Sequence, residues 1–184
     1  MSARPHASGE PSDWVRRWSH LVAPGQRVLD VACGSGRHLR WFAERGCVVT
    51  GVDRDADALA ESSGLGIELV QADIENAAWP LDGRRYDAVI VTNYLWRALL
   101  PTLIASVDAG GLLLYETFAI GNERYGKPSN PNFLLRPGEL LQHAQGLRVV
   151  AFEDGIARSP DRCVQRIVAV RDGGPPGTLP ARLS

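Results

Sequence analysis

The stretch Arg27-Val-Leu-Asp-Val-Ala-Cys-Gly-Ser-Gly-Arg-His38 decides the fold of this 184-residue chain. Its apolar run, residues 28–31, carries a single acid, Asp30, and predicts a strand that meets a tight turn containing Gly34 and Gly36. An amphipathic run begins directly behind the turn, so the expected order is strand, turn, helix. Glycines in such a turn let a ligand approach bare backbone N–H groups at a helix N-terminus. Because Asp30 adds a carboxylate acceptor, the ligand is expected to offer hydrogen-bond donors.

The spacing of the glycines separates the ligand classes that could use this turn. A dinucleotide fingerprint, G-x-G-x-x-G, requires a glycine where the chain has Leu39, and a pyrophosphate would gain nothing from Asp30. A Walker-type loop requires Gly-Lys-Ser/Thr, which is missing here. An ordinary strand–helix turn without a ligand remains open on the turn alone.

Apolar runs elsewhere in the chain predict the rest of a sheet. Strands that are apolar throughout are typical of a parallel sheet covered on both faces by crossover helices. The expected strands are residues 28–31, 47–52, 67–71, 86–92, 111–117, 147–156 and 163–171. The expected helices are residues 12–23, 37–45, 56–63, 100–107 and 136–144, the last with Pro137 in its first turn. The predicted fold class is α/β, a doubly wound, seven-stranded, mostly parallel sheet with a C-terminal antiparallel hairpin.

Composition indicates one domain with two short ends. Residues 1–12 are polar and lack the apolar core of a secretory signal, so we expect a flexible tail there. Residues 13–172 fit a single domain, and the Pro- and Gly-rich residues 173–184 predict disorder. Inside the domain, residues 118–135 form a long loop of a length that is usually functional. Residues 73–85 are too short and too interrupted by proline and glycine for a crossover helix.

The glycine turn resembles motif I of the class I S-adenosylmethionine-dependent methyltransferases, D-x-G-x-G-x-G, in which the acid lies near the cationic amino-acid end of the cofactor. Two positions depart from that motif, because Ala32 replaces the first glycine and His38 the last. The resemblance covers residues 27–171, and it implies a Rossmann-like sheet whose antiparallel seventh strand lies between the fifth and sixth. The short chain is similar to the small stand-alone methyltransferases of the tellurite-resistance type, which act on small molecules or anions.

The resemblance implies a cofactor site at successive strand ends. Asp53, 19 residues after Gly34, matches the acid that accepts both ribose hydroxyls, and Arg54 could cover the adenine. The pair Asp73-Ile74 matches the residues that bind the adenine. The cofactor would be S-adenosyl-L-methionine, with S-adenosyl-L-homocysteine as the product. The implied cofactor-binding residues are Asp30, Ala32, Cys33, Gly34, Gly36, Asp53, Arg54, Asp73, Ile74 and Asn93.

The substrate side is expected after the fourth and fifth strands. Asn93 and Tyr94 follow the strand where the family places its substrate-facing motif, and Arg97 could hold an anionic substrate. These three residues are the catalytic-side candidates, although a solvated arginine at a helix start explains Arg97 equally well. Methyl transfer from a sulfonium needs alignment, exclusion of water and, for a protonated nucleophile, a base. A conspicuous catalytic residue is therefore not required.

Composition also restricts the partners and the setting. Three widely spaced cysteines argue for reduced thiols and a cytoplasmic location, and the isolated histidines give no metal site. The net charge of −1 leaves no electrostatic footprint for nucleic acid, and no apolar run is long enough to span a membrane. A small-molecule substrate is therefore expected, and the oligomeric state is left open. Two rival functions remain: methylation of a protein or RNA, and a non-catalytic sensor of the cofactor.

Overall fold

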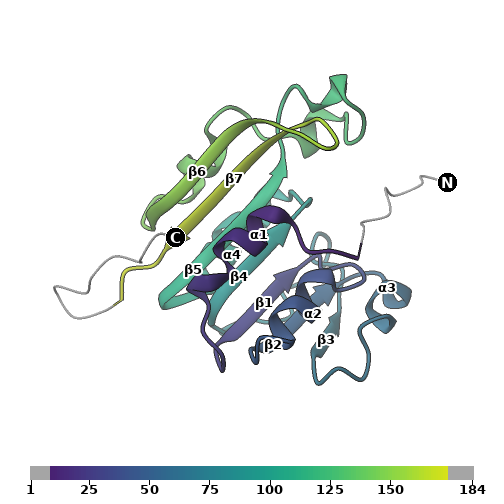
Figure 1. The fold of residues 1–184 in the computed structure, drawn as a ribbon, viewed down its shortest axis with the longest axis vertical. Helices are drawn as coiled ribbons and strands as arrows, with labels where there is room; N and C mark the ends of the chain where they lie inside the picture. The colour runs from purple at the N-terminus through teal and green to yellow at the C-terminus, as the bar shows by residue number, and fades with distance from the viewer. Residues whose placement is uncertain (1–8, 174–184) are drawn as a thin grey trace.

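A seven-stranded sheet forms the middle layer of the protein (Figure 1). The structure, a computed structural model, describes residues 9–173. The strands are β1 (Arg27–Val31), β2 (Val48–Asp53), β3 (Glu68–Gln71), β4 (Tyr86–Thr92), β5 (Val107–Phe118), β6 (Arg148–Ala157) and β7 (Arg162–Val170). Their order in the sheet is β3-β2-β1-β4-β5-β7-β6. Only β7 runs antiparallel to its neighbours, so the predicted fold class and the strand inserted between β5 and β6 are confirmed.

Short helices connect and cover these strands. The α-helices are α1 (Asp13–Trp18), α2 (Arg37–Ala43), α3 (Ala56–Ala60), α4 (Leu100–Ala105) and α5 (Glu139–His143). The 3-10 turns are η1 (Ser19–Leu21), η2 (Arg97–Leu99), η3 (Asn122–Arg124) and η4 (Pro131–Phe133). None of the helices within residues 9–173 is long and apolar enough to cross a membrane. The predicted tails fall mostly on residues 1–8 and 174–184, which lie outside the described residues.

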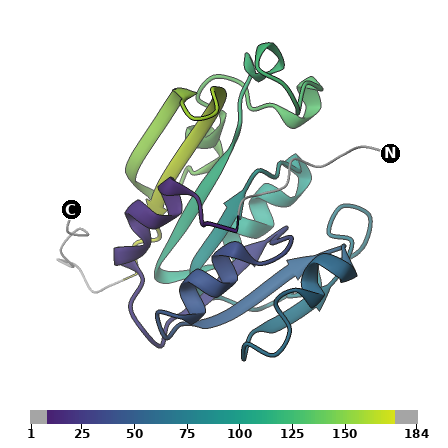
Figure 2. The same cartoon turned by 45° about the vertical axis from the view of Figure 1, so that its right-hand side comes forward.

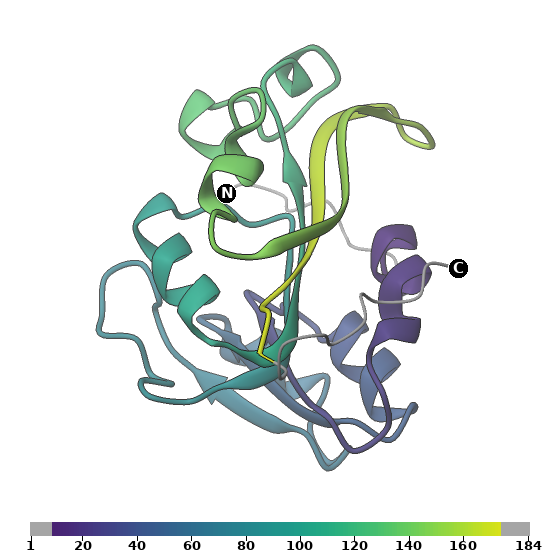
Figure 3. The same cartoon turned by 90° about the vertical axis from the view of Figure 1, so that its left-hand side faces the viewer.

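Two apolar clusters hold the layers together, one on each face of the sheet. On one face, Trp14 of α1 and Phe42 of α2 pack with strand residues such as Val28 and Leu114. On the other face, helices α4 and α5 and the 73–85 loop pack on strand residues of opposite parity. Figure 3 shows α1 and α2 on one side of the sheet and α4 and α5 on the other. The uniformly apolar strands are thus explained by cover on both faces.

Some predicted boundaries were wrong. The first helix is one short α-helix capped by Ser12 and continued only by a 3-10 turn, and not a helix through residue 23. Helix α5 begins at Glu139 behind Gly138, whose φ of 68° is left-handed, so Pro137 precedes the helix and does not lie in its first turn. Strand β5 begins four residues earlier than predicted, because Val107 pairs with Tyr86 before a bulge.

The carboxyl ends of the parallel strands meet at one edge of the sheet. The order of strands reverses between β1 and β4, which lie side by side although β2 and β3 come between them in sequence. Ligands of doubly wound sheets bind outside such a switch point. Figure 2 shows the segment that follows β5 standing beyond the same edge. That segment folds back on itself, because Ile120 N–H donates to Leu135 O and Leu135 N–H donates to Phe118 O.

Candidate cofactor and substrate site

The glycine turn follows β1 directly and has an unusual backbone. Ala32, Gly34 and Gly36 all have left-handed φ values, of 53°, 54° and 78°. An L-residue in this region costs about 1–2 kcal/mol, so Ala32 carries strain that the glycines avoid. The turn is closed by the Gly36 N–H, which donates to Cys33 O at 3.0 Å. Cys33 itself is buried, and burial raises the pKa of its thiol.

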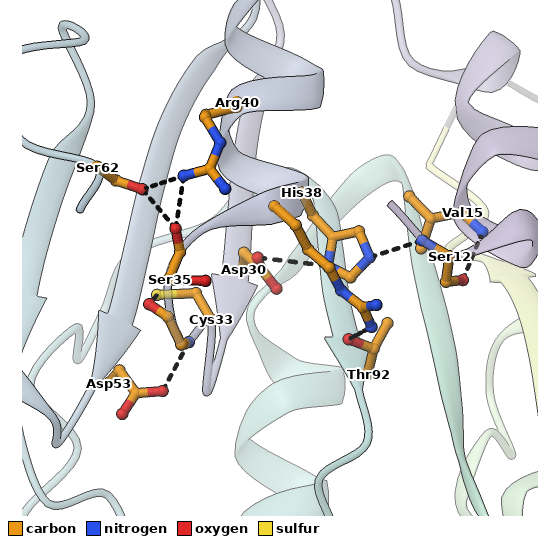
Figure 4. Close-up of polar contacts among 12 residues, drawn as sticks. Ser12, Val15, Asp30, Cys33, Ser35, His38, Arg40, Asp53, Ser62 and Thr92 are labelled. Carbon is orange, nitrogen blue, oxygen red and sulfur yellow. Dashed lines mark hydrogen bonds and ion pairs between the residues drawn. The ribbon is translucent and has the colours of Figure 1, made fainter. Parts of the chain in front are cut away.

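Two side chains, one on α2 and one just after α3, donate hydrogen bonds to a backbone carbonyl of this turn. Ser62, just after α3, is fully buried and donates through Oγ to Ser35 O at 2.9 Å (Figure 4). Arg40 of α2 donates to the same carbonyl at 2.6 Å and to Ser62 Oγ at 3.2 Å. A Cβ added to Gly36 would collide with Ser62 Oγ, whereas one added to Gly34 would meet no atom within 4 Å. The turn therefore faces protein at Gly36 and open space at Gly34.

Asp30, near the end of β1, is buried beside His38 of α2. Asp30 and His38 are both only 1% exposed, and His38 Nδ1 lies 3.6 Å from Asp30 Oδ2 (Figure 4). Since His38 Nε2 accepts a hydrogen bond from Ser12 N–H at 3.1 Å, the ring proton lies on Nδ1 and faces the carboxylate. Asp30 Oδ2 has no hydrogen-bond partner among the described residues. A buried carboxylate oxygen without a partner is costly, which is typical of a position that awaits a ligand's donor.

A small pocket of about 110 Å³ lies on the other side of the turn. Asp53 at its wall is 7% exposed, and its Oδ2 accepts from Gly34 N–H at 2.8 Å while its Oδ1 accepts from Asp55 N–H at 3.0 Å. The Asp73 carboxylate accepts from the Asn76 side chain and from the Glu75 N–H, and these hydrogen bonds hold the pKa of Asp73 below its ordinary value. The pocket is lined by Ala32, Asp53, Arg54, Ala72, Asp73, Ile74, Glu75 and Tyr94. The three strand ends that the sequence singled out therefore meet around one cavity.

The substrate-side candidates separate in space. Tyr94 lines the same pocket as Asp53 and Asp73, and its buried hydroxyl has no hydrogen-bond partner in the described part of the chain. Asn93 is exposed with a left-handed φ of 54°, and its N–H donates to Glu116 O. Arg97 instead contacts both carboxylate oxygens of Glu139, at 2.6 and 3.0 Å, and also donates to Asn132 O and Leu134 O. These contacts give Arg97 a structural role, because they hold the segment before α5 in place.

Two residues at this site were missed by the sequence analysis. Arg37, the first residue of α2, donates to Thr92 Oγ1 and to Glu10 O, both at 3.5 Å. It thus links the start of α2 to the end of β4 and to the segment before α1, but in the sequence it was read only as a helix start. Glu116 is 2% exposed at the end of β5. Glu116 could have been found from the sequence, because it is an acid inside an otherwise apolar strand, as Asp30 is.

The comparisons with known proteins agree with this geometry. Residues 28–109 match the family model described as a methyltransferase domain. A ubiquinone biosynthesis O-methyltransferase of Erwinia tasmaniensis is 31% identical over 116 residues, covering 57% of this chain and 47% of that protein. A malonyl-[acyl-carrier protein] O-methyltransferase of Enterobacter lignolyticus is 43% identical over 106 residues, covering 50% of this chain and 39% of that protein. This chain therefore spans less than half the length of either relative.

The match includes motif I and all three acidic strand ends. Residues 28–109 belong to a methyltransferase domain, and the fold around them is that of the class I S-adenosylmethionine-dependent methyltransferases. TehB from Haemophilus influenzae shares its fold, with a TM-score of 0.69, 19% identity and coverage of 87% of this chain and 62% of TehB. Magnesium protoporphyrin IX methyltransferase from Synechocystis, solved with bound SAH, has a TM-score of 0.65 at 19% identity and covers 86% of this chain and 79% of its own.

S-adenosylmethionine is the cofactor of this methyltransferase domain, and the residues present fit it. The unpartnered Asp30 oxygen suits the cofactor's ammonium group, and the open space in front of Gly34 leaves room for a ligand against the backbone. The pocket beside Tyr94 is smaller than the 300 Å³ or more of usual ligand cavities, so it would take only part of the cofactor. No group of three metal-binding side chains occurs among residues 9–173.

Proposed function

We propose that this chain transfers the methyl group of S-adenosylmethionine to an oxygen atom of a small molecule. The observation that carries the proposal is the meeting of Asp53, Asp73 and the Gly34 turn around one crevice at the switch point of the sheet. Both relatives quoted above are named O-methyltransferases, which supports oxygen as the acceptor atom. The lack of a basic surface excess in the chain, with a net charge of −1, favours a small molecule over a nucleic acid.

Within this proposal, the pocket beside β2 and β3 binds the adenosine. Asp53 accepts the two ribose hydroxyls, using the lone pairs that Gly34 and Asp55 leave free. Asp73 accepts from the adenine amino group and the Ile74 N–H donates to a ring nitrogen, while Arg54 covers a face of the ring. Backbone groups of Ala32, Cys33, Gly34 and Gly36 form the floor.

The amino-acid end of the cofactor lies on the other side of the turn. Asp30 accepts from the ammonium group there. Arg37, whose hydrogen bonds within residues 9–173 are two long ones of 3.5 Å, donates to the carboxylate. Asn93, exposed at the end of β4, stands at the mouth of the crevice, where cofactor and acceptor meet.

The bound cofactor supplies a methyl group on a positively charged sulfur, so the chain's own residues need only align the reactants and exclude water. Burial raises the pKa of the Tyr94 hydroxyl, which therefore stays protonated and acts as a donor rather than as a base. Tyr115 holds the Tyr94 backbone by donating to its carbonyl at 2.8 Å. The role assigned to Tyr94 is thus to wall the cofactor and to orient it.

The test uses cofactor that carries a labelled methyl group. The purified chain is incubated with it and with a cell extract separated into small metabolites, RNA and protein. The proposal expects label in the small-metabolite fraction, and expects none with Asp53→Ala. Label in RNA or protein would favour the alternative acceptors, and cofactor binding without any transfer would favour a sensor.

A further inference from the structure

A row of polar side chains continues from the cofactor crevice across the sheet to β7. Asp30, Thr92, Glu116 and Arg166 lie on the neighbouring strands β1, β4, β5 and β7. Side chains two residues before or after them belong to the apolar cluster under α1 and α2, so all four point to that face. Because β7 is antiparallel, its first residues lie beside the end of β5, at the edge where the cofactor binds.

Two members of this row neutralise each other. Glu116 Oε2 lies 2.8 Å from Arg166 Nε, and Glu116 is only 2% exposed. The Arg166 guanidinium also pairs with Glu153 at 3.3 Å and stands over the Trp14 ring. Glu153 is in turn paired with Arg17 at 3.3 Å. Arg166 is therefore committed to contacts within the protein.

Arg162 lies four residues before Arg166 on β7 and makes fewer contacts. Its only ion pair among the described residues is a long one, 3.8 Å from Nη2 to Glu116 Oε1. Its Nε, like that of Arg166, is buried without a hydrogen-bond partner there, but its side chain is 30% exposed, against 16% for Arg166. Arg162 therefore presents a partly accessible guanidinium with most of its donors unused.

The charges around Arg162 favour an anion. Arg37 donates to Thr92 Oγ1, Thr92 lies opposite Glu116 in the sheet, and Glu116 lies 3.8 Å from Arg162 Nη2. Burial lowers the pKa of Arg37 and Arg162 lowers it further, whereas Asp30 and Glu116 raise it. The linked groups hold one positive charge in excess: the four guanidiniums of Arg17, Arg37, Arg162 and Arg166 face the three carboxylates of Asp30, Glu116 and Glu153. The amino-acid end of S-adenosylmethionine is a zwitterion, and its sulfonium adds a further positive charge. A partly buried positive excess of this kind is stabilised by a bound anion.

We propose that Arg162 binds a carboxylate of the acceptor substrate, so that the substrates of this enzyme are small carboxylic acids. The planar guanidinium offers two parallel N–H donors to a carboxylate, and Glu116 with Arg166 holds the neighbouring charges in place. The inference rests on the proposed function, since it assumes that the cofactor fills the crevice beside Arg37. Arg37 then serves the cofactor and Arg162 the acceptor.

The experiment uses malonate as the probe. The whole chain is first titrated with S-adenosylhomocysteine in a calorimeter, and the saturated complex is then titrated with malonate or with neutral malonamide. We expect malonate to bind and malonamide not to bind. Arg162→Gln should weaken malonate binding at least tenfold and leave the affinity for S-adenosylhomocysteine unchanged. Arg162→Lys should lose less, because it keeps the charge but not the fork of donors.

Arg158→Gln is the matched control, because Arg158 is exposed in the turn of the same hairpin, and it should bind malonate as the unchanged chain does. Circular dichroism checks that each variant is folded. Equal binding of malonate and malonamide, or an Arg162→Gln variant that binds malonate normally, would overturn the inference alone. Loss of S-adenosylhomocysteine affinity in Arg162→Gln would reassign this residue to the cofactor. If the unchanged chain fails to bind S-adenosylhomocysteine, the proposed function fails together with the inference.

Discussion

Replacement of Asp53 by alanine should weaken cofactor binding strongly while the variant still folds. In the proposed complex the carboxylate accepts two ribose hydroxyls, and a hydrogen bond to a charged group contributes about 1.5 kcal/mol at the low end. Two such bonds give about 3 kcal/mol, which corresponds to a roughly 100-fold loss of affinity. The same carboxylate accepts from Gly34 and Asp55 N–H groups, so Asp53→Ala should also lower the free energy of unfolding by about 2–3 kcal/mol.

The assay is calorimetric titration with S-adenosylhomocysteine, accompanied by urea unfolding of each variant. Asp53→Asn keeps one acceptor oxygen and should lose about tenfold in affinity, from one charged hydrogen bond. Asp82→Asn, an exposed acid in the 73–85 loop, is the control and should change neither quantity. A folded Asp53→Ala variant that binds S-adenosylhomocysteine as tightly as the unchanged chain would refute the assignment of the ribose site.

Four further predictions concern the same site and the residues that support it. Gly34→Ala should lower the unfolding free energy only by the left-handed strain of about 1–2 kcal/mol, and should weaken S-adenosylhomocysteine binding because the new methyl group enters the open space. Gly36→Ala should lower the unfolding free energy by about 2–4 kcal/mol, because the collision with Ser62 adds to the same strain. Similar melting curves for the two variants would contradict this. Asp30→Asn should raise the unfolding free energy by about 1 kcal/mol and weaken cofactor binding, and a variant that binds normally would remove Asp30 from the ammonium site. Arg97→Ala should cost about 2–3 kcal/mol of stability, since it leaves Glu139 buried without its cation, and it should leave the affinity for the cofactor unchanged. Burial alone would raise the pKa of Glu139, but its hydrogen bonds with Arg97 and the Arg136 N–H lower the pKa overall. The unchanged chain should therefore be more stable than Glu139→Gln above about pH 4.5 and should lose this advantage as the pH falls further. A stability difference that stays constant in urea titrations from about pH 6 to 3 would contradict this.

The sequence predicted the fold best for the strands that are buried on both faces. Strands β1 and β4 were predicted almost to the residue, because an apolar run covered on both faces has sharp polar ends. Asp53 ends the neighbouring strand β2 and Asp73 follows β3, so the predicted order of the strands was enough to predict that these two acids would line one pocket. The start of α3 also has a local cause, because Asp55 precedes the helix directly and its side chain accepts from Ala58 N–H.

The remainder depends on contacts between residues distant in sequence. The extent of the first helix is limited because Ser12 caps it and a 3-10 turn follows Trp18, and neither feature changes the apolar period. Arg97 and Glu139 are 42 residues apart, so no local pattern reveals their ion pair. Arg162 and Glu116 meet because β7 lies beside β5 in the sheet. The sequence analysis placed the cofactor site within residues 30–93, so it could not predict that Arg162 would lie near it.

The measurement that tests the central claim most directly is an NMR titration of the isotope-labelled chain with S-adenosylhomocysteine. The account predicts amide shifts concentrated at Gly34, Asp53, Ile74 and Asn93, around the crevice at the carboxyl ends of β1 to β4. The protein also has a wider surface hollow of about 790 Å³ between α1 and α2, lined by Arg16, Trp41 and Arg45. Shifts confined to that hollow, or no saturable shifts at all, would contradict the account.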